Sequence, residues 1–214
     1  YNIRSGKKVM FKKKVIVQSG GTWKFHKSSN VELYYEDHEA NGKFIVDGDE
    51  GALVKITSRR NGTSYSKSAH IVGRGTTDHS KSLVSIEYAD ITNTHIDLDR
   101  ITVNSPTFTI QESNFYTTRE EESFLRHVFK LTRPLSEIIS WGNIRRRQAK
   151  VRILNSKFIN TTTYGTNTPN KQLGTFVSDA ASLYLTDVEI DKFHTGLFTK
   201  DNDGVYIRDC QVKN

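Results

Sequence analysis

Two aspartates, two residues apart, are candidates for acid–base or metal-binding chemistry. Asp97 and Asp99 lie in residues 96–103, where large apolar residues alternate with polar ones. Residues two apart on a strand share a face and are separated by about 6.5–7 Å. This spacing is near the range of about 6.5–9.5 Å between the carboxyl groups of inverting glycosidases, and it also suits a cation. An ordinary solvated strand face would show the same alternation, so both interpretations stay open.

A dense basic cluster is the strongest candidate for an anion-binding site. Arg145, Arg146 and Arg147 are followed closely by Lys150 and Arg152. Concentrated positive charge attracts acidic partners. Charge runs are also common on plain solvated surfaces, and that alternative stays open.

Two tyrosines are further candidates for ligand binding. Tyr184 and Tyr206 occupy the same place in two similar segments, so we expect them to stack about 4.8 Å apart on an outward strand face. Exposed stacked aromatic rings can form a platform for a sugar. They can equally be a structural ladder.

Two acidic turns could bind Ca²⁺, which prefers carboxylate and carbonyl oxygens. One contains Asp47 and Asp49, and the other contains Asp201 and Asp203. Both segments are also typical of plain tight turns, and neither has the full ligand spacing of an EF-hand.

A repeat of short strands is expected to position these candidates. Large apolar residues recur at offsets 0, 2 and 7, with a small or medium residue at offset 5. Apolar residues two apart point to one face of a strand. The change from even to odd offsets requires a bend, so each segment is predicted to contain two strands that meet at a corner. The five segments begin at Val84, Phe108, Val151, Leu183 and Val205.

The spacing of these segments predicts a β-solenoid. Val84 to Phe108 spans 24 residues, and Leu183 to Val205 spans 22. The interval of 43 residues from Phe108 to Val151 is interpreted as roughly two coils, and the interval of 32 that follows as one coil with an insertion. Units of this length cannot bury their apolar side alone, so they are stabilised by stacking on their neighbours.

The predicted organisation is a single β-helix domain over residues 1–214 that belongs to a longer chain. Residues 1–82 are interpreted as opening coils and a loop, with apolar pairs two apart separated by Gly-, Ser- and Asn-rich turns. Residues 83–214 are interpreted as regular coils. We expect the last coil to continue into further sequence or to stack end to end on another chain.

The repeat is interrupted around residues 117–148. Apolar residues from Phe124 to Leu131 follow a helix-like spacing up to Pro134. This predicts a short helical excursion, with an irregular coil as the alternative.

One segment carries a resemblance to a known group. The run of Ile153, Asn155, Ser156, Phe158 and Asn160 is similar to the right-handed parallel β-helix repeat of pectate-lyase-like proteins. The resemblance covers about residues 80–214 and implies an all-β, right-handed parallel β-helix from an exported protein. It says little about activity, because the group includes lyases, hydrolases, phage tailspikes, adhesins and non-catalytic modules.

A lyase of this group would need a basic residue to remove a proton from the sugar, and Ca²⁺ or another group to neutralise its carboxylate. By this resemblance Arg100, Lys150 or Arg152 could be the base, with Asp97 and Asp99 as ligands. A hydrolase would instead use an outward aspartate pair as acid and base. The sequence lacks the short motifs expected of a polygalacturonase.

Composition limits the partners. The 214 residues contain 31 Lys and Arg against 24 Asp and Glu, a net charge of +7, which favours acidic partners. No nucleic-acid motif accompanies this charge, so nucleic acid is not favoured. One cysteine, Cys210, excludes an internal disulfide framework and is expected to be a buried apolar residue. No stretch approaches the roughly 18 apolar residues of a membrane span.

These features favour a secreted or cell-surface, non-catalytic β-helix module with a structural or glycan-binding role and no required cofactor. The expected partner is an acidic polysaccharide or another protein chain. The first alternative is a polysaccharide lyase or glycoside hydrolase that acts on an acidic polysaccharide. A phage tailspike or adhesin is a further alternative, for which the outward Leu154 is a lone indication.

Overall fold

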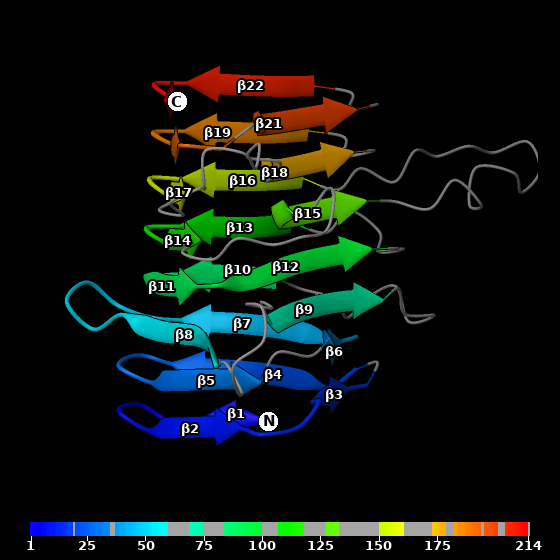
Figure 1. Cartoon of the computed structure of the whole chain (residues 1–214), viewed down its shortest axis with the longest axis vertical. Helices are drawn as coiled ribbons and strands as arrows, with labels where there is room; N and C mark the ends of the chain where they lie inside the picture. Colours follow the sequence, from blue (N-terminus) through cyan, green and yellow to red (C-terminus); the bar gives the residue numbers. More distant parts are fainter. Residues whose placement is uncertain are drawn as a thin grey trace, which may run out of the picture.

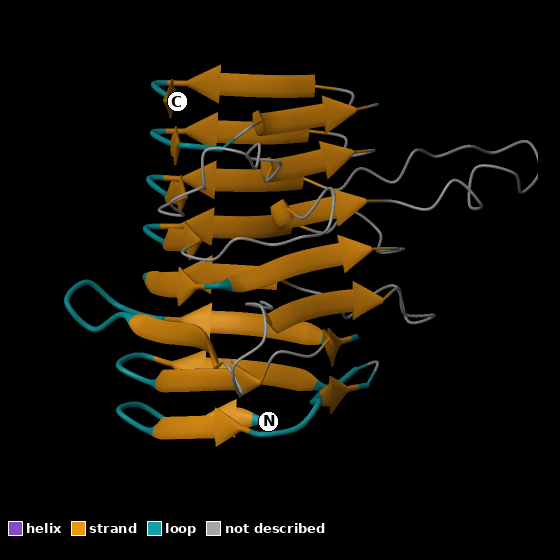
Figure 2. Ribbon diagram, in the orientation of Figure 1, coloured by secondary structure: helices purple, strands orange, loops and turns teal. Residues whose placement is uncertain are grey.

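The computed structural model describes residues 1–18, 20–34, 37–59, 69–74, 84–99, 107–117, 127–132, 150–160, 173–178, 182–193, 195–200 and 204–213. Every regular element within these ranges is a β-strand (Figure 2). Within the same ranges, no helix is long and apolar enough to cross a membrane. The all-β class predicted from the sequence is confirmed.

The strands form three sheets, and all the strand pairs that the structure describes are parallel. Sheet A contains β1 (Asn2–Ile3), β4 (Thr22–His26), β7 (Lys43–Asp47), β10 (Val84–Glu87), β13 (Thr107–Gln111), β16 (Lys150–Leu154), β19 (Ser182–Thr186) and β22 (Gly204–Arg208). Sheet B contains β2 (Lys8–Phe11), β5 (Asn30–Tyr34), β8 (Val54–Arg59), β11 (Ala89–Thr92), β14 (Asn114–Thr117), β17 (Lys157–Asn160), β20 (Glu189–Asp191) and β23 (Gln211–Lys213). Sheet C contains β3 (Ile16–Val17), β6 (Asp37–Ala40), β9 (Ala69–Arg74), β12 (Thr94–Asp99), β15 (His127–Thr132), β18 (Leu173–Ser178) and β21 (Thr195–Lys200).

The chain visits the three sheets in a fixed rotation, A then B then C, and each coil lies on the one before it. Figure 1 shows the strands rising in order from the N-terminus at the base to the C-terminus at the top. Parallel strands joined in this way almost always form right-handed crossovers. The fold is the β-solenoid that the repeat predicts, and it is the right-handed parallel β-helix that the resemblance implies.

The strand register corrects one interpretation of the spacing. Phe108 pairs directly with Val151, and Val151 pairs directly with Leu183. Each interval is therefore one coil with an insertion, and the interpretation of the 43-residue interval as two coils is wrong. Residue counting could not separate these cases, because a loop that leaves the solenoid adds residues without adding a strand to sheet A.

Residues 127–132 form β15, so of the two alternatives for the interruption the helix is wrong there, and the structure agrees with a strand within a coil. Phe129 pairs with Ile96, and Leu131 pairs with Leu98. Phe129 and Leu131 are two apart, so they fit a strand as well as they fit part of a helix. The strand is favoured because β15 pairs with β12 on one edge and β18 on the other, which supplies hydrogen bonds for the backbone on both edges. Residues 118–126 and 133–149 lie outside the described part of the chain.

The core fills the space between the three sheets with the residues that the repeat places inward. Trp23, Phe25 and Phe44 are fully buried and pack edge to face, with centroids 5.2, 5.7 and 5.8 Å apart. Phe115 and Phe158 stack in consecutive coils at 4.7 Å. Each such buried side chain contributes roughly 1.5–3 kcal/mol of transfer free energy. Cys210 is only partly buried, so its expected full burial is wrong.

The corner between sheets A and B is made by one residue in the left-handed conformation. This residue occupies offset 4, between the inward positions 2 and 5, and it supplies the predicted bend. Its φ is 48° at Tyr88, 48° at Glu112, 44° at Asn155, 52° at Asp187 and 53° at Asp209. Asn and Asp tolerate this conformation better than other non-glycine residues.

Buried serines complete the hydrogen bonds beside this corner. Ser113 Oγ donates to Gln111 O over 2.7 Å, and it accepts from the N–H of Ala89 over 3.1 Å. Ser156 Oγ donates to Leu154 O over 2.7 Å, and it accepts from the N–H of Ser113 over 3.3 Å. The hydroxyl links adjacent coils where the bend interrupts the strand ladder, which explains the serine at offset 5 in these two coils.

We expect Ser156→Ala to lower the free energy of unfolding by about 1–3 kcal/mol, because it leaves a buried N–H and a buried carbonyl without this partner. Chemical denaturation would measure the change. The control is Ser85→Ala on the outward face of β10, which should change the free energy by less than about 0.5 kcal/mol. Equal losses for the two variants would contradict the role of the buried hydroxyl.

The left-handed backbone conformation at the corner leads to a second prediction about stability. Asp187→Val should lower the free energy of unfolding by about 1–2 kcal/mol, because Cβ crowds the backbone in this conformation, whereas Asp187→Gly should be nearly neutral. Thr186→Val, one residue earlier in β19, serves as a control for the added apolar surface. Thermal unfolding would measure both variants, and equal stabilities of Asp187→Val and Asp187→Gly would be inconsistent with the corner geometry.

Candidate functional site

The outward face of sheet A carries a column of one arginine and two tyrosines. In the register, Arg152 of β16 lies beside Tyr184 of β19, and Tyr184 lies beside Tyr206 of β22. The two rings stack with centroids 4.8 Å apart and planes 8° apart. The guanidinium carbon of Arg152 lies 5.8 Å from the centroid of the Tyr184 ring, within cation–π range. We call these three residues the Arg–Tyr ladder.

The stacking decides which parts of the rings can meet a ligand. Tyr206 covers one face of Tyr184, and Arg152 lies over its ring as well. A sugar therefore cannot lie flat on Tyr184, and it can reach only the ring edge and the phenol hydroxyl. Tyr206 is 57% exposed. The ladder presents a row of hydrogen-bonding groups rather than a broad aromatic platform.

Local sequence explains why these side chains point outward and lean as they do. Leu183 and Leu185 are buried on either side of Tyr184, so strand alternation turns the tyrosine to solvent. In β22, Gly204 lies two residues before Tyr206 on the same face. A Cβ at Gly204 would lie 2.9 Å from Cε2 of Tyr206 and 3.2 Å from its hydroxyl oxygen. The Tyr206 ring thus occupies the space that a side chain at position 204 would fill.

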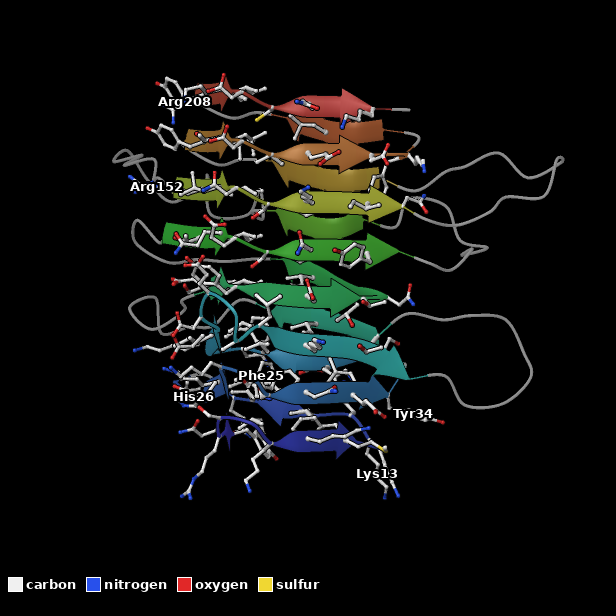
Figure 3. The ribbon with its side chains drawn as sticks, turned by 90° about the vertical axis from the view of Figure 1, so that its left-hand side faces the viewer. Lys13, Phe25, His26, Tyr34, Arg152 and Arg208 are labelled. Atoms are coloured by element: carbon white, nitrogen blue, oxygen red, sulfur yellow. The ribbon has the colours of Figure 1, made fainter. Side chains whose placement is uncertain are left out.

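The arginines of this face have few carboxylate partners. Among the described residues, no carboxylate lies within salt-bridge distance of Arg152. Arg208 lies two residues after Tyr206 in β22 and makes a loose ion pair with Asp209, at 3.6 Å between highly exposed groups. Such exposed pairs contribute little and open easily. Figure 3 shows Arg152 and Arg208 on the same side of the solenoid, so two guanidinium groups are available on this face.

The outward face of sheet B differs in its last three coils, because two lysines there are paired with one carboxylate. Lys157 Nζ lies 3.2 Å and Lys213 Nζ 2.7 Å from the carboxylate of Glu189. Hydrogen bonds from Lys213 and Lys157 hold the pKa of Glu189 below its usual value. This arrangement links three consecutive coils, and we interpret it as a structural network.

The first acidic turn is held by neighbouring cations. Asp47 Oδ2 lies 2.6 Å from Lys24 Nζ and 3.6 Å from His26 Nδ1. Asp49 lies 3.2 Å from Lys27 Nζ, and its other oxygen accepts from the backbone N–H of Glu50. In the part of the chain that the structure describes, no three His, Cys, Asp or Glu residues are grouped to hold a metal ion. The two aspartates therefore serve as salt-bridge partners of the preceding coil.

The aspartate pair lies in β12 of sheet C. Asp97 and Asp99 occupy positions that alternate with the buried Ile96. The register places Asp97 beside Lys130 of β15 and Asp99 beside Arg74 of β9. Sequence reasoning did not find Lys130 or Arg74, because the pairing depends on which strands become neighbours across loops of unknown length.

The remaining predicted residues are placed only in part. Lys150 is the first residue of β16 and pairs with Thr107 and Ser182. Arg100, Arg145, Arg146, Arg147, Asp201 and Asp203 lie outside the described residues.

Two residues beside the ladder were also missed by sequence reasoning. Arg208 could have been found, because it lies two residues after Tyr206 on the same strand face. The role of Gly204 could not have been found from the sequence, because it depends on the direction in which the Tyr206 ring leans.

Comparison with known proteins leaves the family open. No family model matches the chain, and no curated protein matches it. One solved structure that is similar, the crystal structure of an alginate lyase from Paenibacillus sp. str. FPU-7, shares 9% sequence identity, covers 86% of this chain and 76% of its own, and has a TM-score of 0.22. A likeness this low carries no conclusion about activity.

We expect Gly204→Ala to displace the Tyr206 ring and weaken its stacking on Tyr184. The added methyl group would require the ring to move, since the present contact would be only 2.9 Å. NMR of ring-labelled tyrosine would show a loss of the ring-current shift at Tyr184. Thr186→Ala, on the same face of β19, is the control, and an unchanged Tyr184 resonance in the Gly204 variant would contradict this packing.

Proposed function

We propose that the protein is a non-catalytic, extracellular β-helix module that binds an acidic polysaccharide on the outward face of sheet A. The observation that carries the proposal is the Arg–Tyr ladder itself. Three coils place a guanidinium and two parallel phenol rings in one register column, at the spacing of adjacent strands. The proposed extracellular location follows from where such polymers are found.

The chemistry of the ladder suits a carboxylated or sulfated sugar polymer. The guanidinium groups of Arg152 and Arg208 can each form charge-assisted hydrogen bonds to a carboxylate or sulfate. The phenol hydroxyls of Tyr184 and Tyr206 can donate to and accept from sugar hydroxyls. Because these groups rest on strands fixed by hydrogen bonding on both sides in β16 and β19, they are organised before the ligand arrives, which lowers the entropic cost of binding.

The same residues favour binding over catalysis. A guanidinium is not deprotonated in proteins, so Arg152 and Arg208 are poorly suited to remove a proton from a sugar. They are well suited to hold an anion in place. The ladder therefore supports capture of a polymer more directly than it supports its cleavage.

Cleavage of an acidic polysaccharide is a second candidate function, and one observation favours it. On sheet C the register brings Asp97 beside Lys130 and Asp99 beside Arg74, so acidic and basic residues alternate between neighbouring strands. Incubation with pectate or alginate, with Ca²⁺ or EDTA, would test this candidate through the absorbance of unsaturated uronates and the release of reducing ends. Product that disappears in Asp97→Asn would replace the binding proposal with catalysis.

For the binding proposal we expect Tyr206→Ala and Arg152→Gln each to weaken binding to alginate by about 5- to 30-fold, which corresponds to roughly 1–2 kcal/mol per lost contact residue. Isothermal titration with alginate oligomers would measure the affinity. Tyr206→Phe should show a smaller loss, since it keeps the ring and removes only the hydroxyl.

The matched control is Tyr116→Ala, which removes an outward tyrosine from sheet B and should leave the affinity unchanged. Circular dichroism would confirm that each variant is folded. An affinity that is the same in the wild type, Tyr206→Ala and Arg152→Gln would refute the ladder as the binding surface.

A further inference from the structure

The net charge of the protein is concentrated in its first coil. Residues 1–18 contain six Lys and Arg and no Asp or Glu. The remainder of the chain has 25 Lys and Arg against 24 Asp and Glu, so it is close to neutral. Almost all of the net charge of +7 therefore belongs to the coil built by β1, β2 and β3.

Two of these six cations are neutralised by the second coil. Lys8 Nζ lies 3.0 Å from Glu32, and Lys14 Nζ lies 2.6 Å from Glu39. The other four, Arg4, Lys7, Lys12 and Lys13, are exposed. Among the described residues, none of the four has a carboxylate within salt-bridge distance. We call these four residues the basic stripe.

The basic stripe follows β2 across the width of sheet B. Arg4 and Lys7 precede the strand, and Lys12 and Lys13 follow it. Strand geometry puts Lys7 and Lys12 about 17 Å apart. Backbone bonds hold the first end of the stripe, since the N–H of Gly6 donates to Lys27 O over 3.2 Å and the N–H of Asn30 donates to Lys7 O over 2.9 Å. The cations thus border β2 at both of its ends.

The basic stripe is electrostatically separate from the Arg–Tyr ladder. Five strand spacings of about 4.8 Å, about 24 Å in all, separate β1 from β16, and this exceeds two Debye lengths of about 8–10 Å at physiological salt. Asp49, Glu50, Glu87 and Glu112 lie between them at the corner of sheets A and B. Burial, and after it these four carboxylates, raise the pKa of Tyr88 above its usual value. Figure 3 shows Lys13 at the opposite end of the solenoid from Arg152 and Arg208.

We propose that the basic stripe is a second, independent docking surface for an acidic polysaccharide, which the protein binds there through charge alone. The choice of a polysaccharide as the ligand rests on the proposed function, whereas the site itself rests on the charges of the first coil. Two pairs of cations, at the two ends of one strand, can contact separate sugars of a polymer that carries a charge on each sugar. Three of the four cations are lysines, whose flexible ammonium groups suit diffuse contact, whereas bidentate recognition of phosphate favours arginine.

Lysines on a terminal strand also discourage edge-to-edge aggregation. A reversal of their charge distinguishes this protective role from the binding of a polymer. Either sign protects an edge, but only positive charge binds a polyanion. Lys7→Glu/Lys12→Glu/Lys13→Glu should therefore keep the light-scattering mass of the unchanged protein while it loses polymer binding at the stripe.

The experiment measures binding of fluorescent alginate chains to the full chain by anisotropy, over a series of NaCl concentrations. In Lys7→Gln/Lys12→Gln/Lys13→Gln we expect the affinity to fall by at least about tenfold at low salt. The plot of log K against log [NaCl] should become shallower by about two to three units, because fewer counterions are released. The control is Lys43→Gln/Lys55→Gln/Lys192→Gln, which removes the same charge from exposed lysines of later coils.

Each outcome bears on the proposal. An equal loss in the control variant would overturn it, because net charge rather than the stripe would then attract the polymer. Stronger binding of duplex DNA or of phosphatidylserine vesicles than of alginate, lost in the same Lys→Gln variant, would overturn the assignment to polysaccharide. Combination with Tyr206→Ala separates the two sites: independent surfaces give multiplied losses, and failure of the ladder alone leaves the salt-dependent effect of the stripe intact.

Discussion

The parallel hydrogen bonding of each coil to the coils above and below it is the constraint on which the rest of the structure depends. It satisfies the backbone groups of β4 through β19 on both edges and sets one spacing for the whole molecule. A side chain must therefore share its column with the side chains at the same offset in neighbouring coils. Phe115 stacks on Phe158 inside the solenoid for this reason, and Tyr184 stacks on Tyr206 outside it.

The corners show how the chain keeps this register while it changes sheets. One residue in the left-handed conformation reverses the inward and outward parity, and the next residue inward is small. At Ser113 and Ser156 the hydroxyl also restores hydrogen bonds that the bend interrupts. Tyr88 and Glu112 adopt the same conformation although their types disfavour it, which indicates that stacking outweighs a local cost of about 1–2 kcal/mol.

Because the interior is uniform, function on such a scaffold must come from the outward columns. Those columns differ from sheet to sheet. The last three coils of sheet B use their charges within the protein, in the contacts of Lys157 and Lys213 with Glu189. Sheet A leaves Arg152 and Tyr206 available, and the first coil leaves four cations available. Acidic corner residues separate these two surfaces, so one rigid rod can hold two polymer contacts that do not interfere.

The sequence alone determined the strand pattern, because burial on one face imposes a two-residue period that is visible at Val84, Val151 and Leu183. It also placed Tyr184 and Tyr206 in one column. It does not determine which intervals contain loops, so the span from Phe108 to Val151 predicts roughly two coils, and a helical excursion and an irregular coil stay open as alternatives for the segment that contains β15. Phe129 and Leu131 satisfy both periods, and only pairing with β12 chooses between them. The tertiary structure also decided that Arg152 and Tyr206 cover Tyr184, and that Asp97 lies beside Lys130. The strand pairing depends on loop lengths and the ring stacking on ring orientation, which local sequence does not encode.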